Sequence, residues 1–342
     1  MEEIAVVQQR PIQRVLVTGG CGYVGSALVP RLLAANYQVT VLDLMVFGYH
    51  PPYSHANLQI LTGDIRDRSV IKQALHGQDA VIHLAFISND PKYELPVEIG
   101  REINVGAFRP LVEESISAGV RRFVLASSCS VYGKRADARA VTEADQPNPL
   151  TEYALCKLAC ERILSEYAAD DFTTVAVRPA TICGCADRQR FDLTFNQMVC
   201  RAYYQRAITV PNSGSIRPYL HIDDMTRLYL QLLELPASAI AGKTWNVAQG
   251  NQTLLESAAL IQAAVGPDVV LTAEQSQDTR SYSVSSRQIA QEINFTPQLT
   301  LATMVEQFRA AFEQNKYPGA LEDKRYYNIR VQKEYPWRMY HI

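Results

Sequence analysis

Short apolar runs alternate with segments of helical periodicity along the first half of the chain. After the first apolar run, for example, Val24, Leu28 and Leu32 recur at the spacing of one helix face. The expected strands are Arg14–Thr18, Gln38–Asp43, Leu58–Leu61, Ala80–Ala85, Arg122–Ser127 and Thr174–Val177. Regular alternation of strand and helix predicts an α/β fold, in which a doubly wound parallel sheet carries helices on both faces.

The second half continues this pattern with less regularity. Trp245–Val247 predicts a late strand, and the apolar spacing from Leu254 to Ala264 predicts a helix. The last stretch, 316–342, is rich in aromatic and basic residues. We expect this tail to pack over the protein or over a partner subunit.

A glycine-rich turn joins the first strand to the first helix. Glycines at every third position allow a tight turn, let backbone N–H groups approach a pyrophosphate, and let helix and strand pack closely. The positive end of the helix then faces the phosphates. The residues expected to contact a dinucleotide here are Gly19, Gly22, Tyr23, Val24 and Gly25. The alternative is a loop that needs glycine for its geometry alone.

The second strand ends at Asp43, eighteen positions after Gly25. This is where a carboxylate would meet the adenosine ribose of a dinucleotide. A 2′-phosphate beside Asp43 would suffer like-charge repulsion, so the residue favours NAD over NADP.

Two further loops lie at the carboxyl ends of predicted strands, where a parallel sheet binds its ligand. Asp64 and Ile65 could flank an adenine; the alternative is that Asp67 caps a helix and Ile65 is simply packed. Leu84 and Ala85 end the fourth predicted strand, where the cofactor should cross the sheet. We therefore expect cofactor contacts in both loops.

Polar residues near the same edge carry less specific information. His83 lies in an apolar run and is expected to be a buried core histidine. Ser88 and Asn89 form either a turn or a substrate contact. Asn104 either supports the nicotinamide side of the site or caps the helix that follows it to about Gly119.

Composition narrows the class of protein. The 342 residues are 47% hydrophobic and 20% charged, enough for a sizeable core, and the formal net charge of −2 argues against nucleic-acid binding. No apolar run is long enough to span a membrane, and the first residues lack signal-peptide features. The seven cysteines have no metal-finger spacing, so we expect reduced thiols, no metal and a cytoplasmic location.

Tyr153 and Lys157 lie four residues apart on a predicted helix, so both project from one face. A free tyrosine has a pKa near 10, and lowering it by about three units takes roughly 4 kcal/mol of preferential phenolate stabilisation. A lysine ammonium and the positive ring of an oxidised nicotinamide can supply this. A serine from the preceding strand end, 127–130, can hold the substrate oxygen. The alternative is a surface tyrosine–lysine pair.

On these motifs the sequence resembles the extended short-chain dehydrogenase/reductase family, in particular its NAD-dependent nucleotide-sugar epimerases and dehydratases. The resemblance runs from Val15 to about Phe312. It implies a catalytic triad of Ser128, Tyr153 and Lys157, since Ser128 lies four residues before Tyr132 as in the family pattern. It also implies a Rossmann-type NAD-binding domain at 13–177 with a returning segment at about 218–247, a smaller C-terminal α/β substrate domain at 178–217 and 248–315, and a tail at 316–342.

Two positions depart from the family's dehydratases. Sugar 4,6-dehydratases that resemble this chain carry Asp-Glu where Cys129 and Ser130 stand. UDP-glucuronate decarboxylases have a glutamate at the position of Ser130. Without these carboxylates, the resemblance favours oxidation and reduction at one ring carbon, as in the 4-epimerases.

The resemblance also implies where a nucleotide-diphosphate sugar would bind. Arginines suit a diphosphate in charge and geometry. Family members usually have asparagine where Thr181 stands, which removes one diphosphate contact. The candidate substrate contacts are Ser88, Asn89, Ser128, Thr181, Arg190, Asn196, Arg217 and Arg280; surface salt bridges are the alternative for the arginines.

The resemblance thus implies an NAD-dependent nucleotide-sugar epimerase that acts at C4 of the sugar through a transient keto-sugar. One rival is a keto-sugar reductase or dehydrogenase with the same triad. Others are a dehydratase that recruits groups around 88–90 or Cys129, and a dinucleotide sensor without turnover. The family's usual homodimer would pair the helices after Asn104 and through Tyr153. The nucleobase, the sugar and the reacting carbon stay open.

Overall fold

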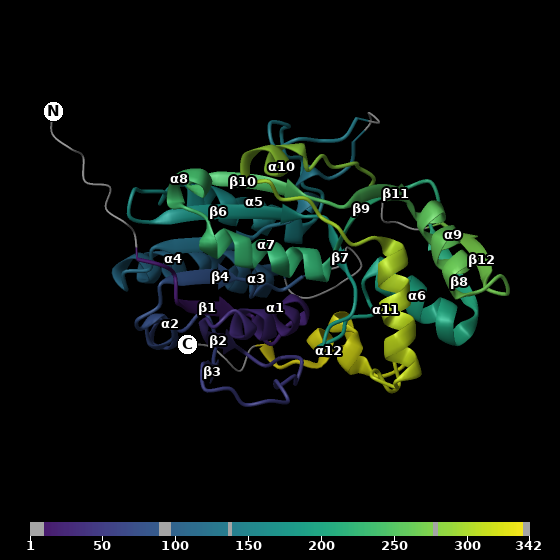
Figure 1. Cartoon of the computed structure of the whole chain (residues 1–342), viewed down its shortest axis with the longest axis horizontal. Helices are drawn as coiled ribbons and strands as arrows, with labels where there is room; N and C mark the ends of the chain where they lie inside the picture. Colours follow the sequence, from purple (N-terminus) through teal and green to yellow (C-terminus); the bar gives the residue numbers. More distant parts are fainter. Residues whose placement is uncertain (1–9, 89–96, 136–138, 276–279, 338–342) are drawn as a thin grey trace.

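The computed structural model describes residues 10–88, 97–135, 139–275 and 280–337. Seven parallel strands form the main sheet in the order β10-β6-β5-β4-β1-β2-β3 (Figure 1). Their bounds are β1 Arg14–Thr18, β2 Gln38–Asp43, β3 Leu58–Thr62, β4 Ala80–His83, β5 Arg122–Ala126, β6 Thr173–Pro179 and β10 Lys243–Val247. The strand order runs outward from β1 in one direction and from β4 in the other. The crevice between the carboxyl ends of β1 and β4 is therefore where such a sheet binds a ligand.

The predicted strands are confirmed, with shifted ends. The fourth strand stops at His83 rather than at Ala85. Ala85 instead lies against the glycine-rich turn, where a Cβ placed on Gly19 would be 2.6 Å from the Ala85 backbone nitrogen. The fifth strand ends at Ala126, and the sixth extends to Pro179. Leu84, Ala85 and Ser127 are therefore loop residues at the ligand edge.

Helices cover both faces of the sheet, as predicted. On one face, α1 (Tyr23–Ala34) packs beside α7 (Ile222–Glu234). On the other, α2 (Arg68–Leu75), α4 (Phe108–Ser117) and α5 (Glu152–Ser165) follow one another. Alternate residues of β1 serve the two cores: Val15 and Val17 pack with the first face and Leu16 with the second. Successive side chains of a strand point to opposite faces, and both faces of β1 are buried, so its sequence is continuously apolar.

A second, smaller region holds the remaining sheets. Strands β7 (Thr181–Cys183), β9 (Ile216–His221) and β11 (Gly250–Thr253) form one sheet, and β8 (Ala207–Pro211) pairs with β12 (Val270–Glu274) in another. Helices α6 (Thr194–Gln205), α9 (Leu254–Val265) and α11 (Leu301–Glu313) pack around them, at the right of Figure 1. Between these parts the chain returns to the main sheet through α7 and β10. The returning segment expected at about 218–247 includes α7 and β10, and the expected domain bounds stay a prediction.

The C-terminal tail packs on the chain itself. Tyr317, Tyr326 and Tyr327 join the apolar core of the second region. After α12 (Asn328–Glu334), Trp337 joins the core on the face of the main sheet that α2, α4 and α5 cover. The tail thus bridges the two regions, which is the first of the two placements expected from its composition.

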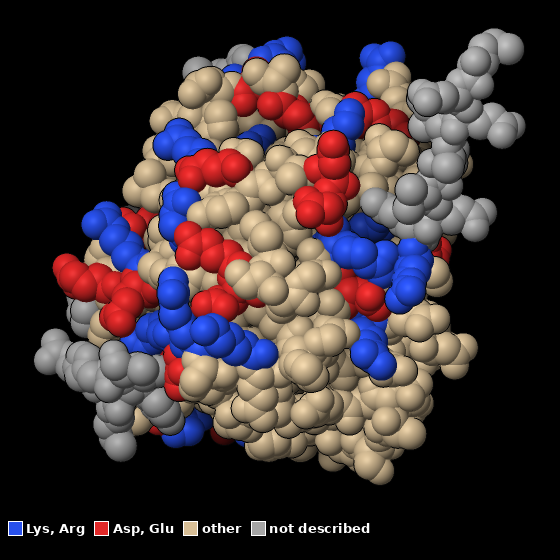
Figure 2. Space-filling view, turned by 90° about the vertical axis from the view of Figure 1, so that its left-hand side faces the viewer, with Lys and Arg blue, Asp and Glu red and all other residues tan. Residues whose placement is uncertain are grey.

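The face drawn in Figure 2 carries charges of both signs, and the cysteines form no disulfide bonds with one another. Figure 2 shows Lys and Arg interspersed with Asp and Glu over the face that it presents. All seven cysteines are free, and six of them are buried. Within the described residues, no helix has the length and apolar character that crossing a membrane requires. Nor do three or more His, Cys, Asp or Glu side chains of that part of the chain gather into a metal-binding group.

His83 is the buried core histidine that the sequence predicts. It is 1% exposed, its Nδ1 lies 2.8 Å from Thr18 Oγ1, and its ring packs on Phe108. Burial, and secondarily the charge of Lys157, lowers the pKa of His83 to about 3. The folded protein therefore keeps this imidazole neutral down to acid pH.

Replacing His83 with glutamine should make the protein less sensitive to acid. An unfolded histidine titrates near pH 6.5, so between pH 6.5 and 3 the unfolded state binds the extra proton and stability falls as pH falls. The slope is about 1.4 kcal/mol per pH unit. Urea unfolding at pH 7.5 and 5 should show His83→Gln losing about 2 kcal/mol less than the wild type between the two pH values. Equal losses would mean that His83 titrates in the folded protein as it does in the unfolded chain.

Candidate active site

The glycine-rich turn has the tight geometry that a dinucleotide loop needs. Gly19 has φ of 73°, and a Cβ on Gly25 would lie 2.4 Å from the carbonyl oxygen of Gly20. Gly22 is the N-cap of α1 and makes no side-chain cap, so backbone N–H groups at this helix end point toward the crevice. The turn, with Tyr23 and Val24, lines the cleft and fits the pyrophosphate of a dinucleotide.

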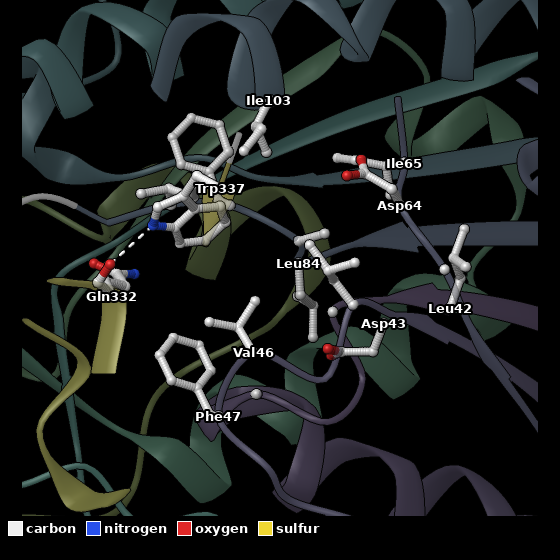
Figure 3. Close-up of a pocket in the computed structure, with 17 residues that line it drawn as sticks. Leu42, Asp43, Val46, Phe47, Asp64, Ile65, Leu84, Ile103, Gln332 and Trp337 are labelled. Atoms are coloured by element: carbon white, nitrogen blue, oxygen red, sulfur yellow. Dashed lines mark hydrogen bonds between the residues drawn. The ribbon is translucent and has the colours of Figure 1, made fainter. Parts of the chain in front are cut away.

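Asp43 is held at the end of β2 by backbone donors. Its two carboxylate oxygens accept hydrogen bonds from the N–H groups of Cys21, at 2.9 Å, and Met45, at 2.8 Å. Burial raises the pKa of Asp43, and these hydrogen bonds act in the opposite direction. The carboxylate faces a cavity beside the turn (Figure 3). This is the position that the sequence predicted for a contact with the adenosine ribose.

That cavity has about 680 Å³ of empty space and is bounded by apolar side chains, including Leu84, Ala85 and Ile103. The structure shows the helix cap proposed for the loop after β3, and the contact of Asp64 and Ile65 with an adenine stays a prediction. Ile65 and Asp64 line the cavity, and Asp67 caps α2 by accepting from Ser69 N and Val70 N. Asp64 is itself paired with Arg66, at 2.6 Å. We name this space, between Asp43 and Ile103, the adenosine cavity.

A larger cleft of about 1570 Å³ continues from the adenosine cavity past the carboxyl end of β5. It shares Gly19, Gly22, Leu84 and Phe86 with the cavity, so the two form one continuous groove. Its floor is formed by the end of β5 and the start of α5. The side chains that line it there include Ser127, Ser128, Ser130, Tyr153 and Lys157.

The predicted triad residues lie together in this cleft. Ser128 and Tyr153 share a hydrogen bond. The Lys157 ammonium lies 5.6 Å from the centre of the Tyr153 ring and donates to the backbone oxygen of Ala126. Helix α5 begins at Glu152, after the N-cap Thr151, so both ring and ammonium project from its first two turns. The structure therefore places a phenol, a hydroxyl and an amine at one point of the groove.

The electrostatics of this triad are dominated by burial. Burial raises the pKa of Tyr153, and the hydrogen bond with Ser128 and the charges of Arg190 and Arg280 oppose that rise. Burial lowers the pKa of Lys157 to about 7. In the protein alone, then, the phenol is neutral at pH 7. The lowered pKa expected for a base relied on Lys157 together with the positive ring of an oxidised nicotinamide, and it stays a prediction. The fixed charge that would ionise Tyr153 must come from what binds in the groove.

Phe86 is a close neighbour of the triad that the sequence reasoning missed. The Lys157 ammonium lies 3.5 Å from the centre of its ring, and the same ring meets Tyr153 edge-on at 5.5 Å. An ammonium over an aromatic face is attracted by the ring quadrupole. The position of Phe86 directly after Ala85, in a loop already expected to touch the cofactor, was the signal that could have found it.

A buried network supports the triad from below. Arg178 in β6 binds both carboxylate oxygens of Glu161 in α5, at 2.9 and 2.6 Å, and also donates to the hydroxyl of Tyr132. Ser127 donates to the same Glu161 carboxylate. All four side chains are buried. The network fixes α5, which carries Tyr153 and Lys157, against the strands that carry the serines.

Three predicted arginines line the other end of the cleft, together with Thr181 and Ser88. They are Arg190, Arg217 and Arg280. Arg190 is paired with Asp192, at 2.7 Å, and Arg217 is largely buried in β9. The charges of Arg217 and Arg280 both reach Tyr282, so the two groups lie near each other. Positive charge is thus gathered in the cleft.

Two predicted contacts lie outside the groove walls. Asn196 is fully buried: its Oδ1 accepts from Gly184 N, and its Nδ2 donates to the Tyr23 hydroxyl and to the Arg190 oxygen. It positions the turn and Arg190 rather than facing a ligand. Asn104 lies in a π-helical turn (Glu102–Gly106), and its amide pairs with both backbone groups of Ile87.

Asn104 therefore fixes the loop after β4 instead of capping a helix. Helical structure begins before Asn104, with α3 (Val97–Arg101), so Asn104 does not start the helix that it was expected to cap. Asn89 lies outside the described residues. Other cleft residues that the sequence reasoning did not single out include Phe47, Tyr282, Asn328 and Ile329.

Comparison with known proteins identifies the family of this chain. The model of the NAD-dependent epimerase/dehydratase family matches residues 15–248. The chain is 34% identical over 223 residues to the protein y4nG of Sinorhizobium fredii, covering 63% of this chain and 52% of that protein. It is 31% identical over 231 residues to the UDP-glucose 4-epimerase of Streptomyces lividans, covering 63% of this chain and 70% of that enzyme. The chain thus spans about half the length of y4nG.

A solved structure extends the similarity to the second region. MoeE5, determined in complex with UDP-glucose and NAD, superposes with a TM-score of 0.75 at 26% identity, covering 87% of this chain and 99% of that one. The family match includes the glycine-rich turn, the triad and the β9 arginine. The chain therefore belongs to the NAD-dependent epimerase/dehydratase family of the extended short-chain dehydrogenases/reductases.

Proposed function

We propose that this protein is an NAD-dependent nucleotide-sugar epimerase that inverts C4 of the sugar through a transient keto-sugar. The observation that carries the proposal is the chemistry of the cleft. It offers a phenol, a serine hydroxyl and an amine, whereas Asp192 is the one carboxylate among the described residues that line it, and Asp192 is paired with Arg190. Removal of water from C6 needs an acid and a base that this set does not supply.

The residues at the dehydratase positions support this choice. Cys129 is fully buried, and its Sγ bonds to the backbone oxygen of Arg178, so it points away from the cleft. Burial also raises the pKa of the Cys129 thiol above its ordinary range. Ser130 lines the cleft but carries a neutral hydroxyl. Neither residue can replace an ionised carboxylate.

In the proposed mechanism Tyr153, as phenolate, takes the proton from the sugar hydroxyl, and Ser128 holds the reacting oxygen. The Lys157 amine lies where it can stabilise the phenolate and hold the nicotinamide ribose. The turn at Gly19–Gly25, Asp43 and the adenosine cavity would hold NAD, which supplies a hydride acceptor and donor and the positive charge near Tyr153. After the keto-sugar turns over, Tyr153 returns the proton.

The substrate class follows from the arginines. Arg190, Arg217 and Arg280 gather beside Thr181 at the far end of the cleft, and a guanidinium suits a diphosphate in charge and geometry. The named ligand of MoeE5 and the named activity of the Streptomyces lividans relative make UDP-sugars the first candidates. We propose that these three arginines bind the diphosphate of a nucleotide sugar.

Turnover in heavy water tests this function. The protein would be incubated with UDP-, dTDP-, GDP- and CDP-sugars without added cofactor, and products read by mass spectrometry and NMR. The proposal expects an isomer of unchanged mass without carbon-bound deuterium. Loss of water with deuterium on carbon would identify a dehydratase. A product two mass units away, formed only with added cofactor, would identify a reductase or dehydrogenase.

Replacing Asp43 with alanine should weaken the preference for NAD. The ribose hydroxyls lose their acceptor and a 2′-phosphate loses its repulsion, so the ratio of NADPH to NADH dissociation constants should fall on the order of tenfold or more. Fluorescence titration with the two reduced cofactors measures this ratio. Asp43→Asn, which keeps the shape and removes the charge, separates repulsion from hydrogen bonding. An unchanged ratio in both variants would remove Asp43 from cofactor selection.

We also propose that the protein is a homodimer. The helices expected to pair by resemblance, α4 and α5, each expose a large apolar side chain: Ile116 is 40% and Leu155 is 46% exposed. Light scattering of wild type and of Leu155→Glu should give a dimer and a smaller species, respectively. A monomeric wild type would contradict this.

A further inference from the structure

The C-terminal tail reaches the cofactor groove. It leaves the second region at Tyr326, which packs edge-on against Phe191 at 5.5 Å, and continues through α12 to Trp337. Gln332 and Trp337 both line the adenosine cavity. Figure 3 shows Trp337 beside Ile103 at one end of the cavity, with Asp64 and Ile65 at the other end. A segment more than three hundred residues from the glycine-rich turn thus forms one wall of the same space.

Trp337 is held firmly in that wall. Its side chain is 7% exposed, its indole N–H donates to the backbone oxygen of Gln332 at 2.8 Å, and its ring packs on Tyr335 at 4.7 Å. With its own N–H satisfied, the indole presents carbon to the cavity. A large, rigid aromatic surface of this kind suits a heterocycle or the apolar face of a ribose.

Gln332 supplies the second, independent observation. Gln332 is 2% exposed and lines the cavity, yet its Oε1 has no hydrogen-bond partner among the described residues. Leaving a buried acceptor unsatisfied costs about 1–3 kcal/mol. Such a group in a binding cavity indicates an acceptor that a ligand donor is meant to satisfy. The adenosine half of a dinucleotide carries suitable donors in its exocyclic amine and its ribose hydroxyls.

We propose that the tail completes the cofactor site: Trp337 packs against the adenosine half of NAD, and Gln332 Oε1 accepts a hydrogen bond from it. This rests on the proposed function for its ligand, NAD. Contact with the tail would also help to keep the cofactor bound between hydride loss and hydride return, as the proposed function requires. Because the tail forms one wall of the cavity, bound NAD would have to lose its contact with Trp337 before it leaves.

The test measures binding of NADH in the absence of any sugar. Trp337→Ala should weaken NADH binding by about tenfold or more and speed its displacement by excess NAD in stopped flow, whereas Trp337→Phe should keep most of the affinity. Gln332→Leu should weaken NADH binding several-fold, up to about tenfold. Arg330→Ala, an exposed change on the same helix, should leave the affinity unchanged and serves as the matched control.

Two further measurements identify the hydrogen-bond donor of the cofactor and test whether Trp337 lies beside it. Reduced nicotinamide hypoxanthine dinucleotide lacks the exocyclic amine. If Gln332→Leu weakens only NADH, the amine is the donor; if it weakens both ligands equally, the donor is a ribose hydroxyl. Because the chain has two tryptophans, energy transfer to NADH in Trp245→Phe reports on Trp337 alone. Strong quenching is expected there and should be weaker in Trp337→Phe, where Trp245 is the reporter.

Two results would overturn the proposal. Unchanged affinity and displacement rate in both Trp337→Ala and Gln332→Leu, with folding confirmed by circular dichroism, would mean that the tail does not touch the cofactor. Tighter binding in Trp337→Ala would mean that the indole competes with the cofactor for the cavity. Failure of the epimerase function leaves these binding results intact, whereas failure of the wild type to bind NADH removes both.

Discussion

Replacing Tyr153 with phenylalanine is expected to lower turnover by a factor of about 10²–10⁴, the range that a positioned acid–base group contributes. The Tyr153 phenol interacts with Ser128, and the centre of its ring lies 5.6 Å from the Lys157 ammonium. Its loss removes proton transfer but leaves the glycine-rich turn, Asp43 and the arginines in place. Turnover of the active nucleotide sugar is the quantity to compare.

The matched control is Tyr229→Phe. Tyr229 is fully buried in α7 near Tyr153, and its hydroxyl has no hydrogen-bond partner in the described structure. Its loss should leave turnover unchanged. NADH binding should survive in both variants, because neither hydroxyl is placed at the cofactor's phosphates. If Tyr153→Phe kept wild-type turnover, the phenol would not be the base.

Breaking the pair of Glu161 and Arg178 should be the most destabilising single change that the structure suggests. Removing one partner of a buried ion pair leaves the other charge uncompensated, which costs about 3–5 kcal/mol. Glu161→Gln keeps the shape and removes the charge, so it tests the charge alone. In urea unfolding, the free energy of unfolding of Glu161→Gln should be lower than that of the wild type by this amount, because Arg178 loses its bidentate partner.

A double variant tells charge from packing. With Glu161→Leu and Arg178→Met together, no buried charge is left unpaired, and much of the lost stability should return. Activity should recover less than stability, because Ser127 also loses its acceptor and α5 loses its tie to β6. A cost below about 1 kcal/mol for Glu161→Gln would mean that the pair does not hold α5 in place.

Local patterns made the sheet and the turn predictable. The strands β1, β2, β4 and β5 are buried on both faces and therefore appear as short apolar runs. The glycines are predictable because a side chain would not fit: a Cβ on Gly25 would lie 2.4 Å from the Gly20 carbonyl oxygen. The pair of Tyr153 and Lys157 was predictable because four residues on a helix place both side chains on one face. These features depend on neighbours in sequence.

The remaining features depend on contacts between distant segments. Asn196 has a polar side chain near the expected nucleotide site, but Tyr23 and Gly184 take up its amide, and nothing in the local sequence reveals those partners. The tail was recognised as aromatic and basic, yet its path to the adenosine cavity follows from the packing of Tyr326 and Trp337 on different cores. Composition could not distinguish this from packing on a partner.

The pKa of Tyr153 also required the structure. The sequence suggested a phenol made acidic by Lys157 together with an oxidised nicotinamide. The structure adds the burial of both side chains and the Phe86 ring against the Lys157 ammonium. Since the pKa of Lys157 is lowered to about 7, its ammonium is a variable charge near neutral pH. The spacing of the motif carries no information about this desolvation.

The central claim is that one hydride leaves C4 of the sugar and returns to the same carbon. The most direct measurement uses substrate labelled with deuterium at C4, mixed with unlabelled substrate carrying a distinguishable ¹³C label elsewhere, without added cofactor. The account predicts an epimerised product in which deuterium remains at C4 of the molecules that carried it at the start. Deuterium lost, moved to another carbon or exchanged into the ¹³C-labelled molecules would contradict it.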